Sequence, residues 1–184
     1  TLVTGDAAGV LSFWDAESGQ RLRTLPTNIA EIYTLAYSPD GSTLAYAGKN
    51  LGTLPNLFSR NLKDDTITSF RIREGEVQES LSIAWSPDGR ILASAGRDRI
   101  VHIWDAQTGM EIEQLKNRIV DNQLVRIFEG PVHRLAFSPN GKWLVTGGDD
   151  HESGAKDKTL MIWDTSAWAD AEPLIFRGPE ADLR

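Results

Sequence analysis

The stretch that decides the fold reads AWSPDGRILASAG, residues 84–96, and it continues through RDRIVHIWD to residue 105. Its centre, Ser86-Pro87-Asp88-Gly89, has the composition of a tight turn. Proline presets the backbone dihedral of the second turn position, aspartate hydrogen-bonds its own backbone, and glycine adopts the left-handed conformation that closes a hairpin. Because short apolar runs rich in β-branched and aromatic residues flank the turn, the stretch predicts two antiparallel strands.

The same turn occurs three times in the chain. Its copies begin at Ser38, Ser86 and Ser138, with separations of 48 and 52 residues, and the third copy has Asn140 in place of aspartate. Each copy stands between two apolar-rich stretches, and no helical stripe of ten residues lies near them. Since strand-turn-strand units that recur at a nearly fixed period indicate a repeat architecture, we predict an all-β chain.

A second repeated marker is a Trp-Asp pair preceded by an apolar residue. Complete copies contain Trp14, Trp104 and Trp163. Because the interval between the first two is 90 residues, or twice 45, a degenerate copy should lie near position 59, where NLFSRN occupies residues 56–61. We expect this segment to keep the strand although it has lost the marker.

A small polar turn follows the Trp-Asp pair, at residues 16–19 and 106–109, and another short strand follows the turn. Each unit therefore holds four strands, within the roughly 40 to 45 residues, plus insertions, of a propeller blade. With these motifs in register, the chain resembles the WD-repeat β-propeller family over almost its whole length. The resemblance implies about 3.75 four-stranded antiparallel blades, part of a seven- or eight-bladed ring.

The repeat phase predicts where the blades begin and end. The four strands of a blade are lettered a to d, outward from the central channel. We expect a partial blade with strands b to d at 1–28, full blades at 29–76, 77–130 and 131–178, and the start of another blade, or a ring closure, at 179–184. Each blade exposes two apolar faces that only neighbouring blades cover, so something must complete the ring. The candidates are the rest of a longer chain, a second copy, or a small four-bladed ring closed by the C-terminal tail.

The resemblance also implies a structural network in each blade. In the family this network often joins a strand-c Trp, a strand-b Ser or Thr, an Asp of the b-to-c turn and a His of the d-to-a loop. The matching positions hold Ser94, Asp98 and Trp104 in the third unit, and Thr146, Asp157 and Trp163 in the fourth. The histidine is missing from its expected places at residues 73–76 and 129–131. We expect the network to be partial and structural, because a buried indole N–H and a buried hydroxyl need partners.

The candidate acid-base and metal-binding residues are few. His102 and His133 are expected to be ordinary strand positions, without an adjacent carboxylate or a second histidine at ligand spacing. Asp149-Asp150-His151-Glu152 is dense in possible metal ligands but lacks the pattern of a calcium loop, so a solvated loop is expected. No phosphate-binding glycine loop or nucleophile elbow occurs. We predict no catalytic residue, no metal site and no cofactor.

Composition narrows the classes of partner. The chain has 26 acidic and 19 basic side chains among its 184 residues, a formal charge of −7, which disfavours nucleic-acid binding. With 40% hydrophobic and 24% charged residues it matches a folded globular protein, and no apolar run reaches the ~20 residues of a membrane span. There are no cysteines, which is compatible with a reducing compartment. We predict a cytoplasmic protein without nucleic-acid or membrane partners.

Binding is expected on the loops, because a rigid scaffold presents variable loops to its partners. The b-to-c connections differ in length, and Lys49, Arg97, Arg99 and Lys156 would form a possible partner-binding rim for carboxylates or phosphates. The alternative is that these residues are solubilising charges. A second insertion, residues 116–124, is expected in the c-to-d region on the opposite face, as a docking lip or a longer strand.

The function predicted from these features is a non-catalytic protein-interaction scaffold that presents propeller loops to peptide or domain partners. An alternative is a sensor or autoinhibitory propeller module of a larger multidomain signalling enzyme. A third is a periplasmic propeller, because the turn with Trp85 and Arg90 also occurs in export-associated propellers.

Overall fold

The computed structural model describes residues 1–50, 55–71, 79–120, 123–126, 128, 130–148, 159–166 and 174–177. Every regular element in this part of the chain is a β-strand, which confirms the all-β prediction. Nothing in the described residues resembles a membrane-crossing helix.

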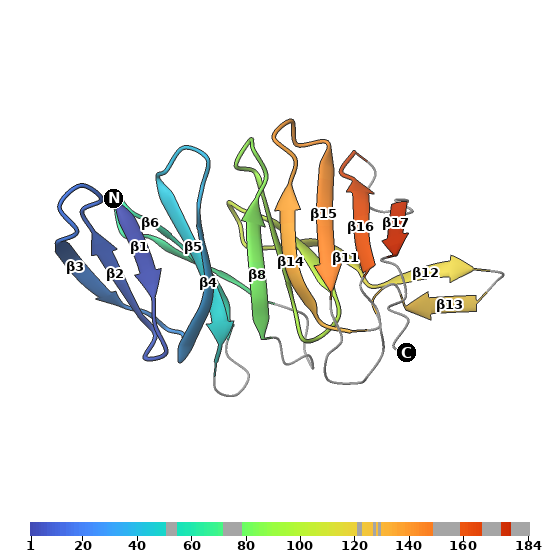
Figure 1. The fold of residues 1–184 in the computed structure, drawn as a ribbon, viewed down its shortest axis with the longest axis horizontal. Coiled ribbons are helices and arrows are strands. Elements are labelled where there is room, and N and C mark those ends of the chain that lie inside the picture. Colours follow the sequence, from blue (N-terminus) through green and yellow to red (C-terminus); the bar gives the residue numbers. More distant parts are fainter. Residues whose placement is uncertain are drawn as a thin grey trace, which may run out of the picture.

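Four antiparallel sheets stand in a row along the chain (Figure 1). The first contains β1 (Leu2–Gly5), β2 (Val10–Trp14) and β3 (Arg21–Pro26). The second contains β4 (Glu31–Tyr37), β5 (Thr43–Lys49), β6 (Leu57–Asn61) and β7 (Ile67–Phe70). The third contains β8 (Ser80–Trp85), β9 (Ile91–Gly96), β10 (Val101–Asp105) and β11 (Glu111–Leu115). The fourth contains β14 (Val132–Phe137), β15 (Trp143–Gly148), β16 (Thr159–Asp164) and β17 (Leu174–Arg177).

Within each sheet the strands pair in chain order, so each sheet is an up-and-down meander. These are the three- and four-stranded antiparallel blades that the sequence predicts. The exact residues at which one unit gives way to the next remain a prediction, and residues 179–184 lie outside the described part of the chain.

The three Ser-Pro turns have one hydrogen-bond pattern. Ser38 Oγ donates to Asp40 Oδ1 at 2.6 Å and accepts the backbone N–H of Thr43 at 2.9 Å. The turns that begin at Ser86 and Ser138 repeat both bonds. The closing glycines, Gly41, Gly89 and Gly141, have φ between +70° and +72°, where a side chain would be strained. The turn chemistry read from the sequence therefore sets the three hairpins.

Neighbouring sheets pack face to face and bury three separate hydrophobic cores. The largest side chains of these cores include Leu11 and Tyr46 between the first and second sheets, Phe70 and Trp104 between the second and third, and Ile103 and Trp163 between the third and fourth. The first strands β4, β8 and β14 lie side by side. Hydrogen bonds tie them together, from Trp85 Nε1 to the Ala36 carbonyl at 3.1 Å and from the Leu135 N–H to Ser82 Oγ at 3.2 Å.

The degenerate unit keeps its strand. β6 covers Leu57–Asn61 and pairs with both β5 and β7, which confirms the prediction for residues 56–61. Asn61 occupies the place of the marker aspartate, and its side-chain oxygen accepts the Lys63 N–H at 2.9 Å. Asp105 accepts the N–H of Thr108, three residues later, at 2.7 Å, and Asn61 accepts the N–H of Asp64 at 3.4 Å, so an amide substitutes for the carboxylate in this turn.

The insertion near residues 116–124 is not in the c-to-d region, and that expectation was wrong. It forms a separate hairpin of β12 (Asn117–Val120) and β13 (Gln123–Arg126). The hairpin follows β11, which already completes the third sheet by pairing along β10 from Val101 to Trp104. The extra residues therefore extend the connection from the outer strand of one sheet to the first strand of the next, and the hairpin projects from the row of sheets (Figure 1).

Candidate functional site

Three sheets contain a tryptophan whose indole N–H donates to a hydroxyl on the neighbouring strand. Trp104 Nε1 donates to Ser94 Oγ at 2.9 Å and Trp163 Nε1 donates to Thr146 Oγ1 at 3.1 Å, both in buried surroundings. In the first sheet Trp14 Nε1 donates to Thr4 Oγ1 at 3.0 Å in an exposed position. Asp157, the remaining residue expected in the fourth unit, lies outside the described residues.

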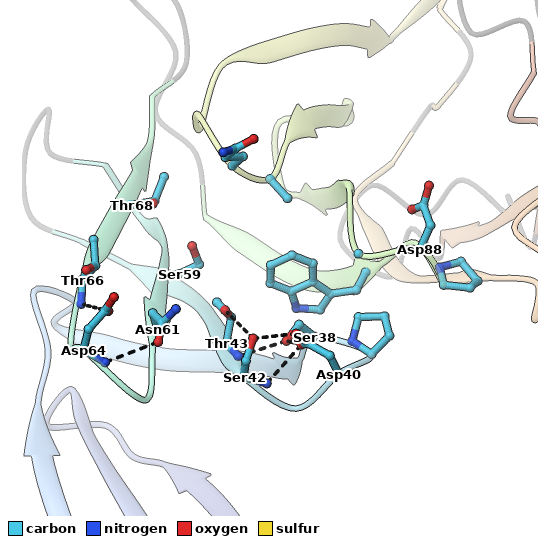
Figure 2. A pocket seen from close by; sticks show the side chains of 16 residues that line it. Ser38, Asp40, Ser42, Thr43, Ser59, Asn61, Asp64, Thr66, Thr68 and Asp88 are labelled. Atoms are coloured by element: carbon cyan, nitrogen blue, oxygen red, sulfur yellow. Dashed lines mark hydrogen bonds between the residues drawn. The ribbon is translucent and has the colours of Figure 1, made fainter.

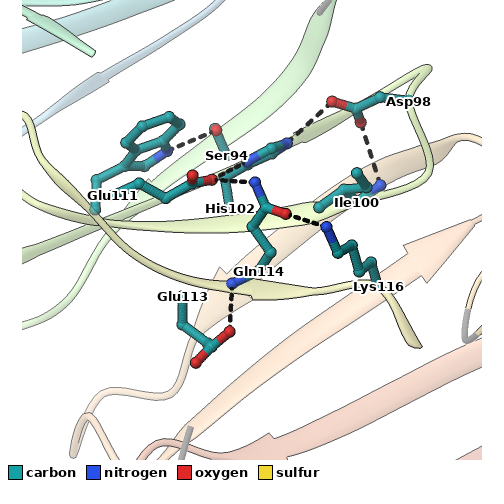
Figure 3. A network of polar contacts seen from close by, with 9 residues as sticks. Ser94, Asp98, Ile100, His102, Glu111, Glu113, Gln114 and Lys116 are labelled. Carbon is teal, nitrogen blue, oxygen red and sulfur yellow. Dashed lines mark hydrogen bonds and ion pairs between the residues drawn. The ribbon is translucent and has the colours of Figure 1, made fainter. Parts of the chain in front are cut away.

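The third sheet adds a histidine to this arrangement. His102 lies on β10, two residues before Trp104, and its side chain is fully buried. Its Nε2 lies 3.0 Å from Asp98 Oδ2 and its Nδ1 lies 2.5 Å from Glu111 Oε1 (Figure 3). The expectation that His102 has no adjacent carboxylate was therefore wrong, because strand pairing brings two of them to the ring.

The two carboxylates are themselves held in place. Asp98 Oδ1 accepts the Ile100 N–H at 3.2 Å in the turn between β9 and β10. Glu111 Oε1 accepts Gln114 Nε2 at 2.9 Å, and Gln114 Oε1 accepts Lys116 Nζ at 2.6 Å. Figure 3 shows this chain of contacts running from the b-to-c turn across β10 to β11 and its end. The buried histidine is therefore the centre of a connected polar network.

The two acceptors determine the charge state of the ring. Burial by itself lowers the pKa of His102, but the hydrogen bonds and negative charges of Asp98 and Glu111 outweigh it and raise the pKa above the usual value. An imidazolium donates from both nitrogens, whereas a neutral ring donates from only one, so the cation satisfies both carboxylates. The ring exposes no atom to solvent, so it has no surface that a substrate could contact.

One signal in the sequence could have located this network. Side chains two residues apart on a strand share a face, so His102 lies on the same face as Trp104, and Asp98 is four residues before it in the preceding turn. Glu111 could not be found in this way. The register of β10 with β11 shifts between Ile103 and Trp104, and this irregularity decides which residue of β11 reaches the histidine.

The second sheet replaces the same positions with other groups. By strand register, Tyr46, Phe58 and Arg60 stand where the third sheet has Ser94, His102 and Trp104. The Tyr46 and Phe58 rings stack with centroids 5.9 Å apart, and Arg60 pairs with Asp65. The buried Tyr46 hydroxyl has no hydrogen-bond partner. An aromatic pair and an ion pair therefore occupy the space that the polar network fills in the third sheet.

The expected rim residues that the structure describes stand at the b-to-c end of the sheets, and two of them are paired with acids. Lys49 Nζ lies 3.5 Å from Glu31 Oε1, and Arg97 Nε lies 2.9 Å from Glu79 Oε2. Tyr33 donates to Glu31 Oε2 at 3.1 Å. Burial, the bond to Glu31 and the charges of Glu31 and Glu79 raise the pKa of Tyr33, while Arg97 opposes them.

The other two rim candidates differ in what the structure shows. Arg99 occupies the turn before β10 with φ at +67°, a conformation that L residues rarely adopt. Lys156 lies outside the described residues, as does the acidic cluster at 149–152. Among the residues the structure does describe, no group of three or more His, Asp or Glu side chains is arranged to hold a metal ion.

A cavity of about 650 Å³ lies at the other end of the sheets, where the Ser-Pro turns are. It opens between the second and third sheets, and Figure 2 shows the side chains around it. Hydroxyl groups and carboxylates dominate its wall, among them Ser59, Asp40, Asp64 and Asp88, and Trp85 contributes an aromatic side chain. No lysine, arginine or histidine is among the described residues that line it.

We compared the sequence with models of known protein families, and one of them matches two segments of the chain. The sequence model described as "WD domain, G-beta repeat" matches residues 68–105 and 122–152. The first match contains four residues of the buried network, Ser94, Asp98, His102 and Trp104, whereas Glu111 follows it. These two segments match WD repeats, and the sheets have the antiparallel strands of WD-repeat blades. The hydrogen bonds from Trp104 and Trp163 lie inside two of these sheets.

Curated WD-repeat relatives are similar over most of the chain. A guanine nucleotide-binding protein subunit beta of Arabidopsis thaliana is 27% identical over 99% of this chain and 46% of its own length. Subunit I of eukaryotic translation initiation factor 3 of Culex quinquefasciatus is 25% identical over 82% of this chain and 45% of its own length. The nuclear distribution protein nudF of Aspergillus niger is 23% identical, over 95% of this chain and 35% of its own length. The chain spans less than half the length of each of these relatives.

Proposed function

We propose that this chain is part of a non-catalytic protein-interaction scaffold, which presents the b-to-c end of its blades to a peptide or a domain. The observation that carries the proposal is the rim of Glu31, Tyr33, Lys49, Glu79 and Arg97, contributed by two neighbouring blades. Their side chains hold one another in place on rigid sheets. Groups ordered in advance lose little conformational entropy when a partner binds, so moderate contacts suffice for specific recognition.

The relatives support a role in assemblies. Two of them carry the word subunit in their names, as a guanine nucleotide-binding protein subunit and as a subunit of an initiation factor. A subunit acts through contacts with other chains. We propose by analogy that this chain also contacts other proteins, and that it does so in the cytoplasm, which fractionation of cells that express the tagged protein tests.

The pairing of the rim changes the chemistry expected of the partner. Because Lys49 and Arg97 each face a glutamate, the described rim presents alternating charges instead of a cationic patch. A partner with both acidic and basic side chains, which exchanges ion pairs with the rim, fits this surface better than a polyanion. Arg99 remains a candidate contact for a partner carboxylate.

A double substitution tests the rim. Arg97→Glu and Arg99→Glu together should remove the partners that co-purify with the intact tagged protein, as quantified by mass spectrometry. The melting temperature should change little, because exposed ion pairs contribute about 0–1 kcal/mol. Arg90→Glu is the matched control, since Arg90 is an exposed cation in the turn at the opposite end of the same blade. Loss of the same partners in the control, or no loss in the double variant, would refute the assignment.

We also propose that further blades cover the ends of the row. Val101 on β10 is fully buried, whereas Leu160, at the equivalent register position on β16, is 42% exposed. A neighbouring blade beside the fourth sheet would bury Leu160 as the fourth sheet buries Val101. The rest of a longer chain or a second copy would supply it. The native mass of the intact protein separates these two, because a second copy doubles the mass.

A further inference from the structure

One residue in the wall of the cavity between the second and third sheets is small where other blades carry a bulky side chain. By strand register, Ser59 on β6 stands at the position of Phe13 on β2, Ile103 on β10 and Ile162 on β16. Phe13 and Ile103 are buried in the cores between sheets. The serine hydroxymethyl group fills far less of the space between the sheets than these side chains do. The small side chain at Ser59 therefore enlarges the cavity of about 650 Å³, whose remaining volume lies between the turns that line it.

The serine in the cavity wall has no partner of its own. Ser59 is 4% exposed, and no described group forms a hydrogen bond with its side chain. Figure 2 shows its hydroxyl without a hydrogen bond to any other residue of the wall. Its Oγ is not among the buried polar atoms that lack a partner, so it reaches the open space of the cavity. A ligand group inside the cavity would form a hydrogen bond with this hydroxyl.

The charges of the wall determine which ligand fits. Asp40, Asp64 and Asp88 line the cavity, and no basic side chain among the described residues there opposes them. Hydrogen bonds from Ser38 and Ser42 lower the pKa of Asp40 to about 2, so this group is ionised at neutral pH. Hydrogen bonds from Thr66 and Ser86 likewise lower the pKa values of Asp64 and Asp88. The wall is anionic, and a cation is the complementary ligand.

We propose that this cavity binds an arginine side chain presented by a protein partner. A guanidinium has five N–H donors spread over a plane, which suits a wall where carboxylates and hydroxyls act as acceptors on several sides. Trp85 adds an aromatic surface of the kind on which guanidinium groups stack. A lysine ammonium is a compact point charge and would engage fewer of these acceptors at once.

The proposal deepens the proposed scaffold function but uses a different surface. The cavity is lined by the turns that join β4 to β5, β8 to β9 and β10 to β11, at the end of the sheets opposite Arg97 and Arg99. Substitutions in the rim can therefore abolish binding at the rim without affecting binding at the cavity, so the two proposals can be refuted separately. If Arg97→Glu with Arg99→Glu leaves arginine binding intact, the cavity acts on its own.

Titration of small arginine derivatives tests the proposal directly. N-acetyl-arginine methylamide is added to the intact protein while the indole N–H resonance of Trp85, assigned with Trp85→Phe, is followed by NMR. We expect a saturable shift, and at least tenfold weaker binding of N-acetyl-citrulline methylamide, which keeps the shape but lacks the charge. Equal binding of the two compounds, or a response only to a polyol such as maltose, would overturn the proposal.

Substitutions in the wall give a second, independent test. Ser59→Ile fills the space with the residue found at Ile103, and Ser59→Ala removes only the hydroxyl. We expect Ser59→Ile to abolish binding and Ser59→Ala to weaken it several-fold. Asp64→Asn should also weaken binding several-fold. Asp15→Asn, in the corresponding turn of the first sheet and away from the cavity, should not. Binding that survives Ser59→Ala, Ser59→Ile and Asp64→Asn unchanged would contradict the site.

Discussion

His102 stacks on Trp104, with ring centroids 5.5 Å apart and planes inclined by 17°. The indole N–H of Trp104 is directed to Ser94, while both nitrogens of His102 are directed to carboxylates. The family network expected here takes its histidine from a loop between blades. In this chain the histidine lies on the same strand as the tryptophan, so the third blade completes its polar core from its own strands and the turn that contains Asp98.

The first prediction concerns the pKa of His102. Because two carboxylates raise the folded-state pKa, their contribution to stability is fully present below the unfolded value of about 6.5 and is lost as pH rises through the folded value. The free energy of unfolding should therefore fall between pH 6 and the folded pKa. Denaturant unfolding at a series of pH values measures this slope.

His102→Gln is the matched variant for that measurement, since glutamine donates a hydrogen bond but does not titrate. Its stability should depend less on pH over the same range than that of the unmodified protein. Nitrogen-15 NMR of the imidazole reports the pKa directly, and a value at or below 6.5 would show that burial outweighs the two carboxylates.

The second prediction concerns the hydroxyl that accepts the Trp104 indole. Ser94→Ala leaves a buried N–H unpaired and should destabilise the protein by about 1–3 kcal/mol. Thr4→Ala removes the corresponding acceptor of Trp14, where solvent can replace it, and should cost less than about 0.5 kcal/mol. Chemical denaturation compares the two variants, and equal losses would contradict the role assigned to burial.

The third prediction concerns the hydroxyl of Tyr46, which is buried without a hydrogen-bond partner. Tyr46→Phe removes the unpaired group and keeps the stacked ring, so it should raise the free energy of unfolding by about 1 kcal/mol. Tyr33→Phe is the control, because its exposed hydroxyl donates to Glu31 and its loss should change stability by less than about 0.5 kcal/mol. A clear loss of stability in Tyr46→Phe would mean that the hydroxyl is paired in solution.

The fourth prediction concerns glycines at the end of the second strand of a blade. A Cβ on Gly96 would lie 1.8 Å from the Glu79 carbonyl oxygen, where the register of β8 with β9 is irregular. Gly96→Ala must therefore displace backbone and should destabilise the protein by about 3 kcal/mol or more. Gly147 is in open space at the position that Ala95 occupies in the third blade, so Gly147→Ala should be neutral or stabilising by about 0.5 kcal/mol. Equal changes in the melting temperatures of Gly96→Ala and Gly147→Ala would contradict this prediction.

Much of the fold could be predicted from local chemistry. The turns at Ser38, Ser86 and Ser138 need only the residues within them, because each is closed by its own serine, its acidic or amide side chain and its glycine. The strand at residues 56–61 followed from the repeat period although its marker was lost. The insertion after Leu115 was misplaced, because periodicity does not show which strand completes a sheet.

Much less of the candidate site could be predicted from the sequence. The contacts of Ser94 with Trp104 and of Thr146 with Trp163 lie where the repeat pattern places the residues. The pairing of Lys49 and Arg97 with glutamates depends on chain segments far apart in sequence, and no local pattern indicates it. No local pattern indicates the cavity at Ser59 either. A serine on a strand does not show whether side chains of the neighbouring sheet fill the space beside it.

The sequence by itself determined the hairpins and the repeat, because turn closure and the alternation of strand side chains act over a few residues. Only the tertiary structure decided that Glu111 reaches His102 and that Ser59 leaves a space between two blades. Both depend on a bulge in one strand or on the packing of one sheet against another. These arrangements are set by the contacts of many residues at once and are not encoded in any single segment.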